Sequence, residues 1–141
     1  MQSYKTWVHW LGVRRGHIKL GNGPEMDFAA PPDNYGEPGV LTPEDAFVAA
    51  LNTCVHMMFI WACERMKIDL VSYDCEAEGF KLVRLDRTEQ YVKVILRPKV
   101  VARGCEKRQV ERALTAAQKY SLVAESIKSE IVVEPEIKII L

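Results

Sequence analysis

The sequence has no long hydrophobic run and no excess charge of either sign. Its 141 residues carry nineteen basic and nineteen acidic side chains, so the formal net charge is zero and gives no electrostatic drive towards nucleic acid. The longest apolar run after His56 extends only from Met57 to Cys63, against the roughly 20 residues that cross a bilayer. The first residues lack the charged-then-apolar pattern of an export signal. We therefore expect a cytoplasmic protein with neither a membrane nor a nucleic-acid partner.

Cysteines are few. The four, Cys54, Cys63, Cys75 and Cys105, show neither C-x-x-C spacing nor the density of small secreted proteins, which favours free thiols. With 48% hydrophobic residues, a chain of 141 residues can bury roughly two-thirds of its unfolded surface, so its stability needs no disulfide or structural metal. No repeat, linker or shift in composition divides the chain. The sequence therefore predicts one domain, residues 1–141, without a cofactor.

Hydrophobic periodicity and turn residues predict the order of the elements. Strands are expected over 4–10, 17–20, 25–29, 69–80, 91–101, 131–133 and 137–141, and helices over 43–66 and 105–127, the second with a break near Tyr120 and Ser121. The segment 31–39, rich in proline and glycine, is expected to be a loop. Runs of strands separated by single helices indicate an α+β fold. We predict antiparallel sheets wrapped around a buried central helix.

The central helix has clear start signals. Thr42 can cap a free amide, Pro43 suits the first helical position, and Glu44 suits the positive end of the helix dipole. From Phe47 to Ala62 the segment is apolar on nearly every side. One layer of a chain this short covers such a helix poorly, so we expect a dimer that buries it from both directions.

Cys54 is the first candidate for chemistry, and it lies within this helix. As a small apolar side chain it could simply fill the core. A reactive thiolate would instead require a nearby cation, and Arg14 and Arg15 of the first hairpin are the candidates. Taken alone, the two arginines fit a solvated turn, and Glu44 fits an ordinary acid at a helix start.

Several segments together resemble one known family. They are the hairpin Gly12-x-Arg14-x-Gly16, the helix start Thr42-Pro43-Glu44, Cys54 ten residues after the glutamate, and the segment Lys119-Tyr120-Ser121-Leu122-Val123. In residues and order they resemble the OsmC/Ohr family of thiol-dependent hydroperoxide reductases. The resemblance implies an intertwined homodimer that reduces organic hydroperoxides or hydrogen peroxide at sites on the subunit interface.

The same resemblance implies roles for individual residues. Cys54 would be the peroxidatic thiol, Arg14 the cation that favours its thiolate and orients the peroxide, and Glu44 the acid that holds the arginine. A register shifted by one residue would exchange Arg14 for Arg15. Helix geometry adds that ten residues rise by about 15 Å, so Glu44 cannot touch Cys54 of its own continuous helix. Arg14 could bridge much of that gap, and a partner subunit could close it.

Ser121 departs from the family pattern. The resemblance places a second, resolving cysteine at this position, and serine cannot form a disulfide. Cys63 lies about 13 to 14 Å from Cys54 along the helix, against roughly 4.4 to 6.8 Å between the Cα atoms of a disulfide. Cys75 lies in a predicted strand at an unknown distance, and Cys105 is expected to be an incidental surface thiol.

Two functions stay open on this basis. The first is a peroxidase in which an external thiol reductant resolves oxidised Cys54. The second is a catalytically weakened relative that binds a small apolar ligand at the dimer interface. The residues that could line an apolar pocket are expected to be core residues first: Trp7, Trp10, Phe47, Met57, Met58, Phe59 and Trp61.

The histidines do not predict a metal site. Residues i and i+2 of a helix point about 200° apart, so Cys54 and His56 cannot share an ion. We expect His56 to form a hydrogen bond with Asn52, one turn back along the helix. The basic stretch 81–112, with Lys93 and Lys99 facing outward, is expected to be a solvated face.

Overall fold

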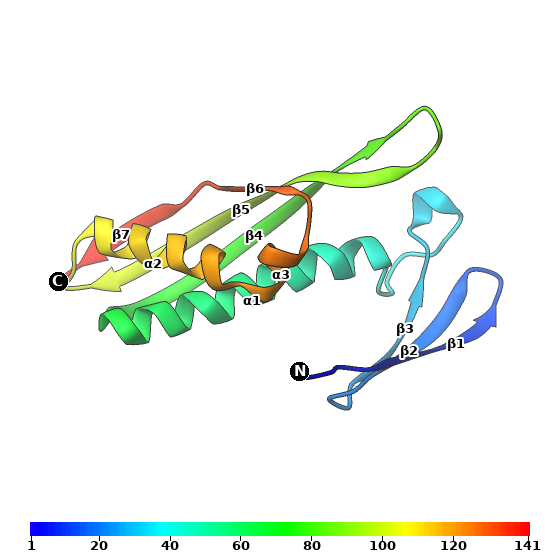
Figure 1. Ribbon diagram of the computed structural model, residues 1–141, viewed down its shortest axis with the longest axis horizontal. Helices are drawn as coiled ribbons and strands as arrows, with labels where there is room; N and C mark the ends of the chain where they lie inside the picture. The colour runs from blue at the N-terminus through cyan, green and yellow to red at the C-terminus, as the bar shows by residue number, and fades with distance from the viewer. The chain divides into compact units, whose positions relative to one another are not determined.

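The computed structural model of the protein describes all residues from 1 to 141. The chain forms two compact units, Met1–Phe47 and Val48–Leu141, and each is described by itself. The mixture of helices and antiparallel strands agrees with the α+β fold predicted from the sequence (Figure 1). That the whole chain forms one domain stays a prediction.

The first unit is a small antiparallel sheet. It contains β1 (Thr6–Gly12), β2 (Arg15–Leu20) and β3 (Glu25–Ala29), hydrogen-bonded in that order. The turn between β1 and β2 requires left-handed backbone at Gly12, whose φ of 103° is costly for any residue with a side chain. A short 3-10 helix, η1 (Pro32–Asn34), interrupts the loop that follows β3. The predicted hairpin, third strand and loop are therefore confirmed.

The long helix α1 (Pro43–Met66) begins as the sequence predicts. The backbone amide of Asp45 donates to the Thr42 hydroxyl oxygen at 3.0 Å, and the Thr42 hydroxyl donates to the Asp45 carboxylate at 2.9 Å. The first bond satisfies one of the free amides of the first turn, and the second joins the two side chains of the cap.

α1 buries one face rather than its whole circumference. The buried residues share one stripe of the helix and are Leu51, Val55, Phe59, Ala62 and Cys63. On another side, Met57 is 61% exposed. The single chain therefore covers α1 along one face, and burial of the helix from both directions stays a prediction.

Length and composition alone would allow α1 to cross a membrane, since its mean hydropathy reaches 1.7 over 18 residues. The expectation from the sequence, which counted only the uninterrupted run from Met57 to Cys63, was wrong on this point. A core helix of a folded domain meets the same criteria, and α1 packs on the sheet along its one buried face. The rings of Phe59 and Tyr73, a residue of the adjoining sheet, lie 5.1 Å apart.

The second unit is built on a larger sheet. Two 15-residue strands, β4 (Asp69–Val83) and β5 (Glu89–Arg103), form an antiparallel hairpin. The last two strands, β6 (Glu130–Val133) and β7 (Glu136–Ile140), both pair with β5 in parallel. The predicted antiparallel pairing is confirmed for β1 to β3 and for β4 with β5, whereas β6 and β7 depart from it. The chain returns to β5 through helices, and such a crossover brings the next strand back in the same direction.

Pro98 lies in a central strand, although proline has no backbone amide to donate to a neighbouring strand. It lies within β5, which has neighbours on both sides. β6 pairs with Lys93 to Leu96 and β7 with Lys99 to Arg103, so Pro98 falls in the gap between the two parallel ladders. A central strand accepts this proline because no neighbour on that side pairs with it.

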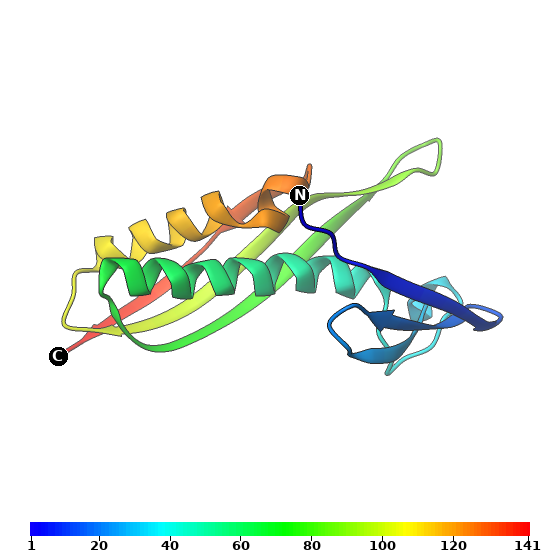
Figure 2. The same ribbon diagram turned by 60° about the horizontal axis from the view of Figure 1, so that its bottom comes forward.

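Two long helices, α1 and the helix that follows β5, cover one face of this sheet. α2 (Lys107–Tyr120) lies beside α1, and the short α3 (Leu122–Ser126) follows a break at Ser121 (Figures 1 and 2). α2 begins two residues later than predicted, because the Glu106 and Gln109 side chains cap its first turn. The side of α2 that faces the core carries its buried residues, which are Val110, Ala113, Leu114 and Ala117.

Buried residues that alternate along β5 share the face covered by these helices, and they are Val94, Leu96, Pro98, Val100 and Ala102; Ile95, between two of them, is buried as well. Val92, two residues before Val94, is 37% exposed because it lies towards the hairpin end of the strand, beyond the core.

Candidate functional site

The candidate site is built around Cys54, in the middle of α1, and Ser121, at the break between α2 and α3. Cys54 is partly buried, and Ser121 has no exposed surface. The two residues are 67 positions apart in the sequence. Ser121 has extended backbone, with φ −73° and ψ 120°, so the chain leaves α2 there and starts a new helix.

A hydrogen bond joins the two side chains. The Ser121 hydroxyl donates to the Cys54 Sγ atom at 3.1 Å. The same hydroxyl oxygen accepts the backbone amide of Ala124 at 3.1 Å and so caps α3. The structure therefore brings together the predicted peroxidatic thiol and the position predicted for the second family cysteine.

Two aromatic rings extend this contact along the helices. The rings of Trp61 and Tyr120 meet edge to face, with centroids 5.4 Å apart. Arg65 lies over the Trp61 ring and Lys119 over the Tyr120 ring. The contact between Trp61 and Tyr120 joins α1 to the end of α2, one residue before Ser121.

The other cysteines differ from Cys54 in their surroundings, and all four thiols are free. Burial, with smaller effects of Cys105 and Glu64, raises the pKa of the Cys63 thiol to about 11. Burial also raises the pKa of Cys75. Since the thiolate is the reactive form, both residues are poor nucleophiles at neutral pH. Cys63 lies nine residues beyond Cys54 on the unbroken helix α1, as expected from the sequence.

The contacts expected for His56 are different in the structure. Its ring packs against Tyr73 of β4, with centroids 4.8 Å apart. The side-chain amide of Asn52 donates instead to the backbone carbonyl of Cys75 at 3.2 Å. The predicted hydrogen bond between His56 and Asn52 is therefore wrong, because the neighbouring strand offers each of them a partner.

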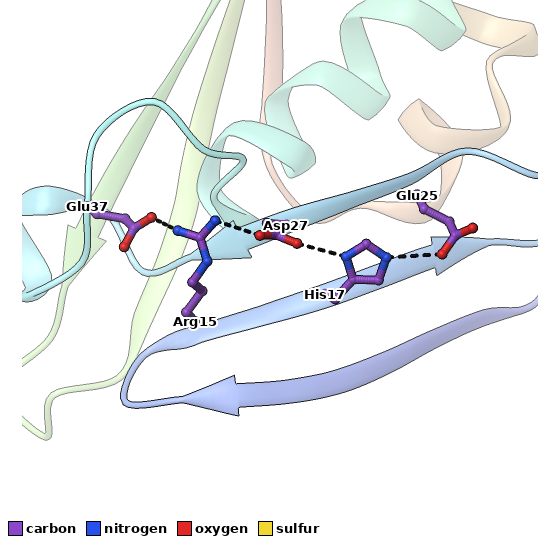
Figure 3. A network of polar contacts seen from close by, with 5 residues as sticks. All are labelled: Arg15, His17, Glu25, Asp27 and Glu37. Carbon is purple, nitrogen blue, oxygen red and sulfur yellow. Dashed lines mark hydrogen bonds and ion pairs between the residues drawn. The ribbon is translucent and has the colours of Figure 1, made fainter.

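In the first unit, a polar network surrounds Arg15, one of the two candidate arginines (Figure 3). Arg15 forms ion pairs with Asp27 of β3 and with Glu37 in the loop after η1. Arg14 forms none of these pairs, and its guanidinium lies over the Tyr35 ring, 5.4 Å from the centroid. The charge of Arg15 is thus compensated by two carboxylates, which makes Arg14 the better candidate for a catalytic cation.

The network continues to His17, which lies between two carboxylates. Its Nδ1 is 2.8 Å from Asp27 Oδ1, and its Nε2 is 3.0 Å from Glu25 Oε1. The hydrogen bond to Asp27, followed in size by the one to Glu25, raises the pKa of His17. The hydrogen bond to His17, followed in size by the one to Arg15, lowers the pKa of Asp27.

This network was not predicted from the sequence, although a signal for it exists. Basic residues alternate at Arg15, His17 and Lys19, and acidic residues alternate at Glu25 and Asp27. Alternate residues of a strand share one face, so two such segments joined by a tight turn predict cross-strand charge pairs.

The remaining predicted residue, Glu44, lies in the first turn of α1. The helix is continuous from Glu44 to Cys54. These two residues of one chain are therefore separated by a rise of about 15 Å, as the sequence predicts. The structure contains no group of three or more histidine, cysteine, aspartate or glutamate residues placed to hold a metal ion.

Comparisons with known proteins agree with this arrangement of elements. A family model described as OsmC-like protein matches residues 36–136. An OsmC-like protein of unknown function from Vibrio cholerae superposes with a TM-score of 0.87 at 25% identity, covering 96% of this chain and 99% of that one. No curated protein is significantly similar in sequence.

Two solved structures described as organic hydroperoxide resistance proteins share the fold. The one from Legionella pneumophila has a TM-score of 0.74 at 19% identity and covers 98% of both chains. The one from Bacillus subtilis has a TM-score of 0.66 at 18% identity and covers 97% of this chain and 98% of that one. Since the family model matches well over half of the sequence, this chain belongs to the family of OsmC-like proteins.

Proposed function

We propose that the protein is a cysteine-based peroxidase that reduces organic hydroperoxides, or hydrogen peroxide, through the thiolate of Cys54. The observation that carries the proposal is the 3.1 Å contact between Cys54 Sγ and Ser121 Oγ. It supports the interpretation of both sequence motifs at once, since a peroxidatic thiol and the position of its resolving partner have to lie side by side.

The proposed reaction has two stages. The Cys54 thiolate attacks the terminal oxygen of the hydroperoxide, so that an S–O bond forms and the O–O bond breaks. The sulfur is oxidised to a sulfenic acid, and the leaving alkoxide takes up a proton and departs as the alcohol. An external thiol then forms a mixed disulfide with release of water. A second external thiol restores Cys54 and leaves as the disulfide.

The external thiol follows from the identity of residue 121. A serine hydroxyl does not form a disulfide with the sulfenic acid, and Cys63 lies too far along α1 to do so. Resolution within the chain is therefore not expected from either residue.

Arg14 and Glu44 are proposed to complete the site. The guanidinium of Arg14 would favour the thiolate and orient the peroxide oxygens through its fixed donors. Glu44 would hold that guanidinium in place. Because Glu44 and Cys54 of one chain are separated by ten residues of continuous helix, we propose that these groups meet across the interface of a homodimer.

Exposed apolar side chains support the proposal of a dimer. All of β1 before Gly12 is exposed, including Trp10, which is 72% exposed. Met57 on α1 is exposed as well. Apolar surface of this kind on an edge strand and a central helix is typical of a face covered by another chain.

A second candidate is a relative that has kept the fold and lost turnover, and that binds a small apolar ligand at the dimer interface. The replacement of the resolving cysteine by Ser121 favours it.

The experiment that separates these functions measures consumption of an organic hydroperoxide in the presence of a small dithiol. Cys54→Ser should abolish it, because serine cannot supply a thiolate. Cys105→Ser, which removes a partly exposed thiol outside the site, should keep it. Consumption by Cys54→Ser at the wild-type rate would refute the peroxidase.

A second substitution tests the absence of internal resolution. Ser121→Cys places a thiol where the hydroxyl now touches Sγ, so peroxide should produce a disulfide between Cys54 and the introduced cysteine, detectable by peptide mass. Ser126→Cys, on α3 but not in contact with Cys54, is the matched control and should give no such bond. The absence of the disulfide in oxidised Ser121→Cys would contradict the proposed chemistry at Cys54.

A further inference from the structure

Ser121 is more than the position of a missing thiol. It has no exposed surface, and its hydroxyl has two partners, the Ala124 amide and the Cys54 sulfur, both at 3.1 Å. A buried serine at a helix break needs only the first of these to cap the helix. The second bond is the one that requires explanation.

The position of the hydroxyl proton follows from these partners. A hydroxyl group has one proton to donate and two lone pairs. The Ala124 amide uses a lone pair of the oxygen, which leaves the proton for an acceptor. Water does not reach this buried side chain, and no buried side-chain oxygen or nitrogen lacks a partner. The proton therefore points to the Cys54 sulfur.

The hydroxyl is also fixed in place, because the capping bond restrains its rotation. The neighbouring hydroxyl on α1 cannot replace it, since Thr53 donates to the Ala49 carbonyl of its own helix at 2.8 Å. His56 packs on Tyr73, and Asn52 is bonded to β4. Ser121 is the one side chain that donates a hydrogen bond to Cys54 Sγ.

We infer that Ser121 is a positioning residue for Cys54: its hydroxyl donates to the sulfur, holds it in one rotamer and favours the thiolate over the thiol. This inference rests on the proposed function, because a peroxidase is what would use a reactive Cys54. The experiment that tests it does not require peroxidase activity. A hydrogen bond to the charged form of a titrating group stabilises that form. The residue that replaces the resolving cysteine thus promotes the first stage of the reaction while it leaves the second to an external thiol.

The test is the pH profile of alkylation of Cys54 by iodoacetamide, read by peptide mass so that the four cysteines are followed separately. Ser121→Ala should move the midpoint of that profile upward by roughly one pH unit, the size expected for one hydrogen bond to a charged group. Ser121→Thr keeps a hydroxyl and should keep the wild-type midpoint. Ser126→Ala, which removes a hydroxyl bonded only to Leu122 of its own helix, should leave it unchanged.

Loss of the α3 cap has to be separated from loss of the donor. Ser121→Gly also lacks the hydroxyl but is tolerated at a helix start, so it should show the same upward shift as Ser121→Ala even if the alanine variant folds poorly. An unchanged midpoint in Ser121→Gly, or an equal shift in Ser126→Ala, would overturn the inference. If peroxide failed to oxidise wild-type Cys54, the proposed function would fail, while this comparison of alkylation profiles would still decide the role of Ser121.

Discussion

The two units of the protein are stabilised in different ways. Residues 48–141 bury a continuous apolar core between a sheet and two helices, with Phe59 and Leu51 fully inaccessible. In residues 1–47 only Gly16, Ala29 and Thr42 are buried. The first unit is instead held by the ladders of β1, β2 and β3 and by the polar network around Arg15.

This difference indicates where each unit obtains its stability. A small sheet without an apolar core is marginal in water unless another surface covers it. The exposed aromatic residues of β1 supply a surface that a partner chain could bury. Burial of this surface in the proposed homodimer would stabilise the N-terminal unit, whereas the C-terminal unit has a core of its own.

The largest effect on stability is expected from the core of the C-terminal unit. Phe59→Ala removes a fully buried ring, so it should lower the free energy of unfolding by about 3 to 5 kcal/mol. Urea denaturation followed by circular dichroism measures this change.

Trp10→Ala is the matched change in the N-terminal unit. The Trp10 side chain is 72% exposed, so the substitution should mainly weaken dimerisation. Analytical ultracentrifugation should then give a higher dissociation constant for the dimer. Both variants are compared at a protein concentration where they are monomeric. If Trp10→Ala then lowered the free energy of unfolding as much as Phe59→Ala does, Trp10 would be part of a core and not of a surface that a partner covers.

The next effect concerns the two arginines of the N-terminal unit. Arg14→Ala should slow oxidation of Cys54 by a hydroperoxide by roughly 100-fold, the scale of losing one fixed donor to the reacting oxygens. Arg15→Ala should slow it much less, because that guanidinium is committed to Asp27 and Glu37. Stopped-flow measurement of the oxidation step compares them. The reverse order would assign the catalytic role to Arg15.

The smallest effect is a pH dependence in the N-terminal unit. His17 has a pKa raised above its usual 6.5 by Asp27 and Glu25, so its protonated form stabilises the folded sheet. That contribution is fully present below pH 6.5 and is lost as the pH rises through the raised value. Thermal unfolding of His17→Asn between about pH 6 and 9 should lack this loss.

His9→Asn, at the paired position of β1, is the control and should keep the dependence. If His17→Asn retained the wild-type dependence of the melting temperature on pH, the network would not contribute to the stability of this unit.

Local signals were sufficient to predict most elements. The Thr42 cap, the apolar face of α2 and the break at Ser121 all depend on neighbours within a few residues, and the structure has each of them. The parallel pairing of β6 and β7 could not be predicted in this way. It depends on how the chain crosses back over the sheet, and the same crossover places Pro98 between two ladders.

The candidate site shows the same limit. Helix spacing predicts the distance from Cys54 to Cys63, since both lie on α1. It says nothing of Ser121, which is 67 positions away and reaches Cys54 only through the packing of α2 against α1. The resemblance to a known family supplied that link. The pairing of Arg15 with Asp27 was within reach of the sequence, because the facing strands alternate in charge.

The most direct test of the central claim is site-resolved trapping of sulfenic acid. Reduced wild-type and Cys54→Ser proteins are treated with a slight excess of an organic hydroperoxide in the presence of a sulfenic-acid trap, and the adducts are read by intact and peptide mass. A peroxidatic Cys54 predicts rapid trapping on Cys54 alone, and none in the serine variant. Slow oxidation spread over all four cysteines would contradict that role and would leave ligand binding as the function to test.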